Sequence, residues 1–421
     1  MGERLIFHID VNSAFLSWTA AYRVRVLGEA SDLRDVPSAV GGDRSERKGI
    51  VLAKSTPAKE FGVKTGEPIG VALEKCPALV VVPADYKLYV DASRKFVSLL
   101  REISPAVEQY SIDEAWADMT GTEQLYGSAM AAAELIRRRV KEELGFTVNI
   151  GISSNKLLAK MAGDFEKPDK IHTLFSEEIP VKLWPLPVRD LFLVGRATEK
   201  KLHAMGIYTI GELASADVQM LRRRLYKPGE TLWHFANGRC TDRIFSTPQG
   251  NKGYGNSVTM PEDVLDRDTA CQVLLSLCET VGMRMRRDGK KGRCVTVQIR
   301  TSDFQDSSHQ RKLESATDVT EELYREACRL FDEHWDGETP LRQLGVQVSQ
   351  MAEESGRQFS FFEQGYGARY ERLSRVDSVV DELREKYGER VLFRARFTGS
   401  AEQQMAGGLA KERRTGVTKP V

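Results

Sequence analysis

Two adjacent carboxylates, Asp113 and Glu114, lie between two short apolar stretches and are the residues best suited to chemistry. Neighbouring side chains in a regular strand point to opposite faces, so both can serve one site only where the backbone bends, at a hairpin turn or strand end. A third carboxylate, Asp10, ends the apolar stretch Leu5 to Ile9. Three acids at strand ends predict a hard-oxygen site suited to Mg²⁺ rather than zinc. The competing interpretation is a solvated acidic turn.

Phe15 lies about one helical turn after Asp10, on a helix expected to begin at Asn12 or Ser13 and to run through Val24. If Asp10 holds a metal ion at its strand end, the ring of Phe15 would wall the sugar side of a bound nucleotide. A core position on an amphipathic helix explains the same residue equally simply.

Two lysine-bearing segments are suited to phosphate. The first follows an apolar strand over residues 50–52 and carries Lys54, Lys59 and Lys64 with a hydroxyl at Ser55 or Thr56. Such groups can hold a triphosphate through charge-assisted hydrogen bonds. The second is a helix start at which Lys156 and Lys160 share one face, beside unpaired backbone N–H groups. A solvated basic surface is the alternative for both segments.

The region from Leu191 to Ile210 predicts two short helices around a glycine hairpin, with glycines at Gly195 and Gly206. This pattern is typical of a helix-hairpin-helix, which offers backbone N–H groups to a DNA phosphate. Leu193 occupies the position where such hairpins usually have their first glycine.

A basic cluster follows between residues 284 and 300. This stretch has seven positive side chains and one negative side chain, Asp288, so its local net charge is +6. That excess fits a surface that tracks nucleic-acid phosphates, although a solvated turn is the alternative. The positive residues are Arg284, Arg286, Arg287, Lys290, Lys291, Arg293 and Arg300.

Composition sets wider bounds. A chain of 421 residues has room for roughly two to four domains, and its net charge of +1 neither requires nor excludes a nucleic-acid partner. Its six cysteines include no Cys-x-x-Cys pair, which argues against structural zinc and favours reduced thiols used in packing. No stretch approaches the eighteen or so apolar residues of a membrane span, so we expect a soluble cytoplasmic protein.

The order of the predicted elements indicates several domains. Strands and helices alternate over residues 1–170, which predicts an α/β unit. The sequence pattern changes near Pro185, and the composition changes again at a linker near residues 250–255. Strands are expected at residues 5–9, 50–52, 106–110, 115–117, 146–152, 256–259, 294–300 and 341–348, and helices at residues 119–143, 269–287 and 315–333.

Three motifs in this order resemble a known family. The stretches Asp10 to Phe15, Ser111 to Ala115 and Gly151 to Ala162, with Lys167-Pro168 behind them, are similar to those of Y-family translesion DNA polymerases of the bacterial DNA polymerase IV/V type. The resemblance covers residues 4 to about 395 and implies an α+β multidomain fold. It implies a ferredoxin-like palm (1–20 and 80–170), fingers (21–79), a helix-hairpin-helix thumb (171–243), an α/β little finger (250–355) and a clamp-type peptide with a C-terminal segment (356–398). The tail, residues 399–421, is expected to be disordered.

The resemblance also implies roles. Asp10, Asp113 and Glu114 would be the catalytic carboxylates that hold two Mg²⁺ ions, Val11 would lend a backbone carbonyl, and Phe15 would be the steric gate against ribose. The triphosphate would be held by Lys160 and Lys59, the latter where the family usually has arginine, with Lys54 and Thr56 nearby. Primer-template DNA would be contacted by Gly195, Arg196, Gly206, Arg284, Arg286, Arg287, Lys290, Lys291 and Arg293. A monomer acting on deoxynucleoside triphosphates is expected.

Three departures from the family pattern bear on this interpretation. Thr56 replaces the usual tyrosine and Ala14 a usual aromatic. The peptide from Gln358 to Phe362 resembles a sliding-clamp motif in which Gln358, Phe361 and Phe362 would bind the clamp, but phenylalanine replaces aliphatic residues at positions 359 and 361. A strand packed on the chain's own core is the alternative. A catalytically silent DNA-binding protein and a nucleotidyl cyclase are the competing functions.

Overall fold

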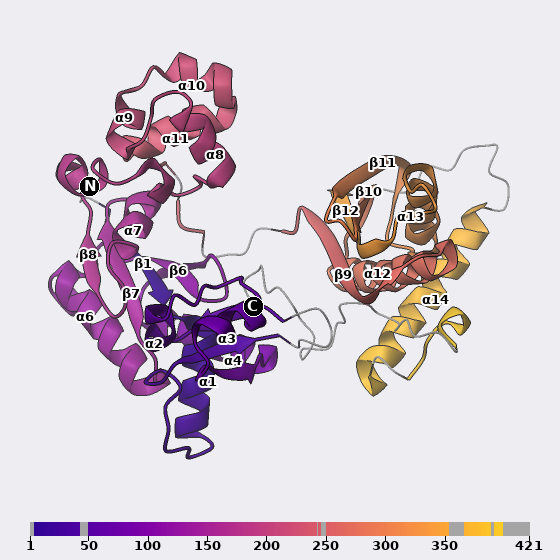
Figure 1. The fold of residues 1–421 in the computed structure, drawn as a ribbon, viewed down its shortest axis with the longest axis horizontal. Helices are drawn as coiled ribbons and strands as arrows, with labels where there is room; N and C mark the ends of the chain where they lie inside the picture. Colours follow the sequence, from indigo (N-terminus) through magenta and orange to yellow (C-terminus); the bar gives the residue numbers. More distant parts are fainter. Residues whose placement is uncertain are drawn as a thin grey trace. The chain divides into compact units, whose positions relative to one another are not determined.

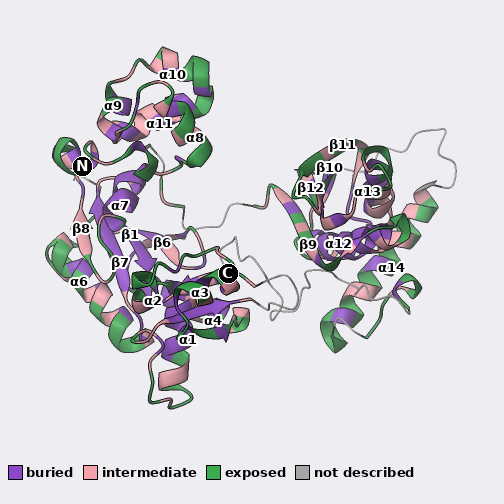
Figure 2. Ribbon diagram, viewed as in Figure 1, coloured by how far each residue is buried: buried purple, intermediate pink, exposed green. Residues whose placement is uncertain are grey.

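The computed structural model describes residues 4–42, 49–241, 243–245, 250–352, 366–388 and 391–398. They fall into two compact units, the first built from the described residues within 4–42 and 50–245 and the second mainly from those within 250–398 (Figure 1). Each unit has its own buried core, which Figure 2 shows in its central strands and covering helices.

The central sheet of the first unit has the strand order β5-β6-β1-β7-β8. Its strands are β1 (Ile6–Val11), β5 (Ala106–Gln109), β6 (Glu114–Asp118), β7 (Val148–Ser153) and β8 (Ile171–Thr173). All neighbours are antiparallel except β7 and β8. With α4 (Tyr86–Ile103) between β1 and β5 and α6 (Ala129–Arg139) between β6 and β7, the arrangement is ferredoxin-like.

The two faces of β1 have different surroundings, because side chains alternate along a strand. Phe7 and Ile9 join the main core with residues of α1 (Ala14–Arg25), α4 and α6. On the other face, Ile6 packs with Ala159 of α7 (Lys156–Gly163). Asp10 shares this second face by its alternation with Ile6, so the sheet directs it toward the α7 side.

The prediction of one long helix over residues 119–143 is wrong for the first half of that range. The chain forms a short helix, α5 (Glu123–Tyr126), then turns at Gly127 before α6. Gly127 has a φ of 78°, a conformation that breaks a regular helix and favours glycine. The helix ends in a π turn, Val140–Leu144.

A smaller sheet joins residues that precede and follow the lysine-bearing segment. Its strands β3 (Val51–Lys54), β2 (Ser38–Gly41) and β4 (Val80–Pro83) lie in the order β3-β2-β4. Two helices, α2 (Thr56–Glu60) and α3 (Ile69–Lys75), pack on it around Val51, Ala58 and Ile69. The sequence predicted β3 alone of these three strands.

The rest of the first unit is helical. Short turns at Ser176–Glu178, Ile179–Leu183 and Val188–Asp190 lead into α8 (Arg196–His203), α9 (Ile210–Ser215), α10 (Val218–Leu225) and α11 (Lys227–Ala236). The start of α9 is a capping box, in which Thr209 Oγ1 accepts a hydrogen bond from the Glu212 N–H and the Glu212 carboxylate accepts one from the Thr209 N–H.

The second unit is an antiparallel sheet covered by two helices. The strands β9 (Gly253–Val264), β10 (Lys291–Thr301), β11 (Asp306–Thr317) and β12 (Leu341–Ala352) lie in the order β11-β10-β12-β9. The helices α12 (Arg267–Arg287) and α13 (Thr320–His334) pack on the sheet through residues such as Val273, Leu277 and Phe331. Two predictions are corrected here. Residues 253–255 open β9 rather than forming a linker, and residues 315–317 end β11 rather than beginning a helix.

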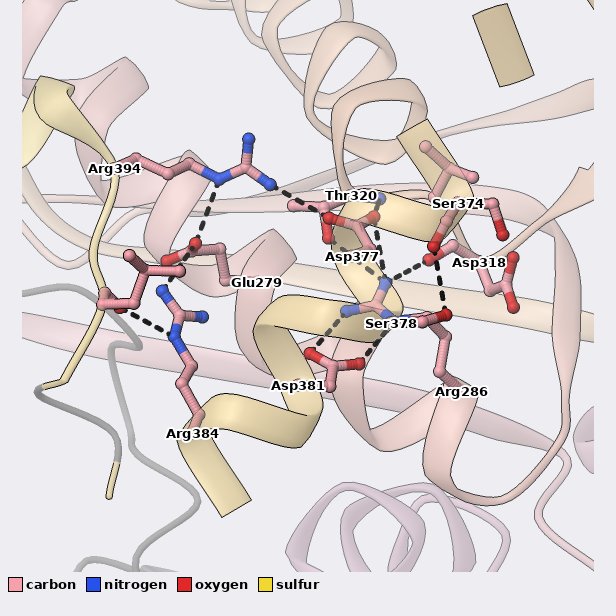
Figure 3. Close-up of polar contacts among 12 residues, drawn as sticks. Glu279, Arg286, Asp318, Thr320, Ser374, Asp377, Ser378, Asp381, Arg384 and Arg394 are labelled. Carbon is pink, nitrogen blue, oxygen red and sulfur yellow. Dashed lines mark hydrogen bonds and ion pairs between the residues drawn. The ribbon is translucent and has the colours of Figure 1, made fainter. Parts of the chain in front are cut away.

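A last helix, α14 (Tyr366–Tyr387), is attached to this unit by charged groups (Figure 3). Arg286 of α12 forms ion pairs with Asp377 and Asp381 of α14, at 3.3 Å and 2.6 Å. Glu279 of α12 accepts from Arg384 at 3.1 Å and from Arg394 at 3.0 Å. Such a buried network is costly unless its members are paired, so it fixes where α14 packs. A single turn, Ala395–Phe397, ends the described chain.

Among the described residues, no helix is long and apolar enough to cross a membrane.

Candidate active site

The three predicted carboxylates come to one end of β1 and β6. Asp10 of β1 is paired in register with Glu114 of β6. Asp113 lies in the hairpin turn before β6, and the Val11 N–H donates to its carbonyl at 3.0 Å. The Tyr110 N–H closes the turn on the Glu114 carbonyl at 2.9 Å. The bend that the sequence required between the two adjacent acids is therefore present.

The carboxylate of Asp113 is held by its own turn. The Ser111 hydroxyl donates to Asp113 Oδ1 at 2.6 Å, and the Glu114 N–H donates to that hydroxyl at 3.1 Å. Burial raises the pKa of Asp113, although the Ser111 hydrogen bond opposes the rise. The side chain is thus an oriented carboxylate whose charge is disfavoured by its surroundings.

The carboxylate of Glu114 lies close to the side chains of Lys160 and His8. Lys160 Nζ lies 3.1 Å from each of its carboxylate oxygens, and His8 Nε2 lies 3.7 Å from Oε2. Burial alone would raise the pKa of Glu114, but the His8 ring and the Lys160 charge bring it down to about 2. Lys160 is itself buried, with its ammonium 5.4 Å from the centre of the Phe192 ring.

Asp10 forms an ion pair with Lys167, a contact that the spacing of the motifs did not predict. The ammonium of Lys167 contacts Asp10 Oδ2 and also lies 2.9 Å from Asp164 Oδ1. Burial raises the pKa of Asp10 and the Lys167 charge opposes that rise. Burial would lower the pKa of Lys167, but the charge of Asp10 raises it. Lys167 and Asp10 are 157 positions apart, so only the fold brings them together.

The donor set fits a hard divalent cation. It consists of three carboxylates beside the Val11 backbone, and burial penalises the charge of Asp10 and Asp113, a penalty that a bound cation would relieve. Within the described ranges, no three Asp, Glu, His or Cys side chains are already arranged as a metal-binding group. Lysines neutralise Asp10 and Glu114 instead, so metal ligation by these residues stays a prediction.

Phe15 lies near the start of α1 and is half-buried. Its ring stacks on Tyr89 of α4, with centroids 4.5 Å apart and planes 12° apart, and meets Tyr86 edge-on at 6.3 Å. The ring is therefore held rigidly on one side. This packing accounts for the core interpretation of Phe15 without removing the gate interpretation, because part of the side chain stays exposed.

The helix has Ser13, one of the two predicted start residues, at its cap position. Ser13 has a φ of 46°, and its side chain makes no capping hydrogen bond. Asn12 is drawn into a buried amide contact instead, donating to Asn149 Oδ1 at 3.0 Å, and it accepts from the Thr147 hydroxyl at 2.9 Å.

The lysine-bearing segment forms the end of β3 and the start of α2. Ser55 is buried, and its hydroxyl is engaged in hydrogen bonds within the protein: it accepts one from the Ala58 N–H and donates one to the Val36 carbonyl. Thr56 is exposed, so of the two predicted hydroxyls it is the one open to a ligand. Burial lowers the pKa of Lys54, and the positive charge of Lys59 lowers it further. These two ammonium groups repel one another, a cost that a bound anion would offset.

Lys156, four residues before Lys160 on α7, is paired with an acid and an aromatic ring, and phosphate binding by it stays a prediction. Its ammonium lies 2.7 Å from Glu108 Oε1 and 4.4 Å from the centre of the Trp116 ring. Lys156 is buried in these contacts and therefore holds α7 against the sheet.

The hairpin before α8 forms in spite of Leu193. This residue is exposed and has a φ of 71°, the left-handed conformation for which glycine has no steric cost. Gly195 then precedes the first residue of α8, Arg196, and Gly206 turns the chain after α8 with a φ of 77°. Of the two helices predicted between Leu191 and Ile210, α8 forms within that range, whereas α9 begins only at Ile210.

The basic cluster needs a correction at Arg286. Its side chain is 10% exposed and its guanidinium is paired with Asp377 and Asp381 (Figure 3), so it is not free to bind a phosphate. The acids that neutralise it lie 91 and 95 positions away, outside the stretch from which the local charge was counted. Arg300 is likewise paired, with Asp306 at 2.6 Å.

The remaining predicted DNA contacts lie in the C-terminal part of α12, the turn that follows and the start of β10. Arg287 and Arg293 are exposed, while Arg284, Lys290 and Lys291 are partly buried. The clamp-type peptide with Gln358, Phe361 and Phe362, and the tail 399–421, lie outside the described residues.

Comparisons with known proteins agree with this architecture. Residues 9–164 match the impB/mucB/samB family, residues 176–207 match the IMS family HHH motif, and residues 251–361 match the impB/mucB/samB family C-terminal domain. The structure is similar to a Y-family DNA polymerase chimera of Dbh and Dpo4, with a TM-score of 0.70 at 22% identity over 83% of this chain and 100% of that one.

Relatives of nearly full length carry one name. The chain is 44% identical to DNA polymerase IV of Clostridium acetobutylicum over 394 residues, 93% of this chain and 98% of the relative. It is 38% identical to DNA polymerase IV of Alkaliphilus oremlandii over 93% of this chain and 98% of the relative. It is 35% identical to DNA polymerase IV 2 of Bacillus subtilis over 96% of this chain and 97% of the relative. The chain therefore belongs to the impB/mucB/samB family and is a Y-family translesion DNA polymerase of the DNA polymerase IV type, which adds deoxynucleotides to DNA under the direction of a template.

Proposed function

We propose that Asp10, Asp113 and Glu114 are the catalytic carboxylates of this polymerase and that they hold two Mg²⁺ ions. The observation that supports the proposal most strongly is the pairing of Asp10 with Glu114 across adjacent strands, with Asp113 fixed in the turn beside them. Residues directly opposite on antiparallel strands have side chains about 5 Å apart, close enough to share ligands.

The bound ions would favour deprotonation of the primer 3′-hydroxyl and neutralise charge on the leaving pyrophosphate. The protein contributes position rather than a nucleophile. The hairpin fixes Asp113 through Ser111, and β1 fixes Asp10 and the Val11 carbonyl. No covalent step on the protein is needed.

Lys160 and Lys167 serve in this structure as counter-charges to Glu114 and Asp10. Both ammonium groups can turn to a triphosphate once the carboxylates have other cationic partners. Lys54, Lys59 and Thr56 would approach the same triphosphate from the end of β3 and the start of α2. We therefore assign five residues to nucleotide binding beside Phe15, which adds Lys167 to those that the sequence predicted.

Phe15 is proposed as the steric gate that rejects a ribose 2′-hydroxyl. Its stacking on Tyr89 supports this role, because a gate discriminates only if the ring cannot move aside. Gly195, Arg196 and Gly206 are proposed to bind DNA phosphates through the hairpin, and Arg284, Arg287, Lys290, Lys291 and Arg293 through the second unit. Clamp binding by Gln358, Phe361 and Phe362, a monomeric state, a cytoplasmic location and the division into palm, fingers, thumb and little finger stay predictions.

The variant Lys167→Ala tests the triphosphate assignment. We expect its KM for the incoming deoxynucleotide to rise about 10-fold or more, because a charge-assisted hydrogen bond contributes about 1.5–3 kcal/mol. The measurement is steady-state incorporation of a single nucleotide at varied concentration. Lys170→Ala is the matched control, since Lys170 is half-exposed and pairs only loosely with Glu166, at 3.6 Å. An unchanged KM for Lys167→Ala with a raised KM for Lys170→Ala would contradict the assignment.

A further inference from the structure

Two cysteines from different helices of the second unit lie side by side. Cys271 of α12 and Cys328 of α13 are 57 positions apart, yet their Sγ atoms are 3.5 Å from one another. Both are free thiols, and the Cys328 S–H donates to Cys271 Sγ. Cys271 is buried, whereas Cys328 is partly exposed.

The surroundings of the pair lower the pKa of Cys271. The hydrogen bond from Cys328 and the positive charge of Arg267, one turn earlier on α12, lower it, while burial and the charges of Asp332 and Asp268 oppose them. Arg267 is held by Asp332 of α13 at 2.6 Å, so its position is fixed. The thiolate is the reactive form of cysteine toward oxidants.

A second arginine contacts a residue one helical turn from Cys328. The guanidinium of Arg396, from the turn Ala395–Phe397, contacts the hydroxyl of Tyr324, which lies one helical turn before Cys328 on α13. Cys278, two turns further along α12, offers a contrast within the same helix. It is fully buried and its pKa is raised by burial, so it has the surroundings of an inert packing cysteine.

We propose that Cys271 and Cys328 form a redox modification site, at which a peroxide converts the two thiols into a disulfide that joins α12 to α13. The Cys271 thiolate attacks one peroxide oxygen and the O–O bond breaks, which leaves a sulfenic acid and hydroxide. Cys328 then attacks that sulfur, the S–O bond breaks, and water leaves. The two sulfurs lose two electrons in total, the peroxide gains them, and the products are one disulfide and two waters.

The geometry requires only a small movement. A disulfide bond is about 2.05 Å long, so the sulfurs must approach by roughly 1.5 Å from their present separation. The bond would close a loop that contains β10 and β11, because these strands lie between α12 and α13 in the chain. A cross-link of this kind restricts the unfolded chain, so the oxidised second unit should unfold at a higher temperature.

The test treats the full-length folded protein with hydrogen peroxide, blocks the remaining thiols by alkylation and maps disulfides by peptide mass spectrometry. We expect one disulfide, between Cys271 and Cys328, with the other four cysteines alkylated, and we expect a raised unfolding midpoint that dithiothreitol reverses. Cys271→Ser and Cys328→Ser should each abolish both effects. Cys294→Ser, which changes a buried cysteine of β10, should retain them.

Two results would overturn the proposal. One is a Cys271–Cys328 pair that stays reduced at a peroxide dose that fully oxidises glutathione added to the same sample. The other is that peroxide joins the cysteines of the folded protein in the same variety of pairs as it does in protein unfolded in urea. Both readings come from the unmodified chain, so they do not depend on whether a variant folds.

Discussion

The variant Asp113→Asn is expected to lose primer extension by about a thousandfold or more. Removal of this carboxylate charge would disable the proposed ion site, which would contribute several kcal/mol to the stability of the transition state; about 4 kcal/mol corresponds to a factor of a thousand. The amide keeps an oxygen that can accept the Ser111 hydrogen bond, so the turn should survive. The measurement is single-turnover incorporation of one correct deoxynucleotide.

Asp118→Asn is the matched control for this variant. Asp118 ends the same strand, β6, at the far end from Glu114, and its side chain accepts from the Thr120 N–H at 3.0 Å. The chemical change is identical, so we expect its incorporation rate to stay within a few-fold of the parent protein. Comparable activity in Asp113→Asn and Asp118→Asn would refute the assignment of Asp113.

The second large effect is expected at the gate. Phe15→Ala should lower the preference for deoxynucleotides over ribonucleotides by roughly 10- to 100-fold, because the steric overlap that it removes costs about 1–3 kcal/mol. Incorporation of deoxynucleotides should change little. The measurement is kcat/KM for each sugar with the same base and the same template.

Loss of the ring also removes its stacking contact with Tyr89. The experiment must therefore distinguish a loss of protein stability from a change in sugar selectivity. Phe304→Ala serves as the control, because Phe304 is exposed in the second unit, where its main contact is the Arg342 side chain. The gate role predicts a changed ratio of the two sugars in Phe15→Ala alone. Equal losses for both sugars would mean that Phe15 only supports the fold.

The sequence predicted the positions of the three carboxylates well, because their constraint is local. A strand that ends in Asp10 and a bend at Asp113 follow from apolar alternation and from the two adjacent acids. The structure adds that Asp10 and Glu114 are register partners. No local pattern contains that fact, since it depends on which strands become neighbours.

For the charged side chains, the sequence interpretation missed contacts between residues that are far apart in the chain. Arg286 resembled its basic neighbours until α14 supplied Asp377 and Asp381. Lys167 reaches Asp10 only through the fold, and Lys156 is taken up by Glu108, 48 positions away. Charge counted along a short stretch therefore overestimates the surface available to DNA.

Secondary structure failed where the pattern was weak. The strand β11 is largely polar and exposed along its length, so it lacks the apolar alternation that identifies a strand. The strands β2 and β4, of four residues each, were not predicted, although β3 and β5 of the same length were. The left-handed conformations at Ser13 and Leu193 could not be predicted either, because neither residue type favours a positive φ.

The most direct test of the shared carboxylate site is a crystal structure with primer-template DNA, an incoming deoxynucleotide and Mn²⁺, recorded for anomalous scattering. We predict manganese peaks in contact with Asp10, Asp113 and Glu114, with the ammonium groups of Lys160 and Lys167 turned to the triphosphate. Peaks that lie away from these three residues, with Asp10 still paired to Lys167 and Glu114 to Lys160, would contradict the proposed mechanism.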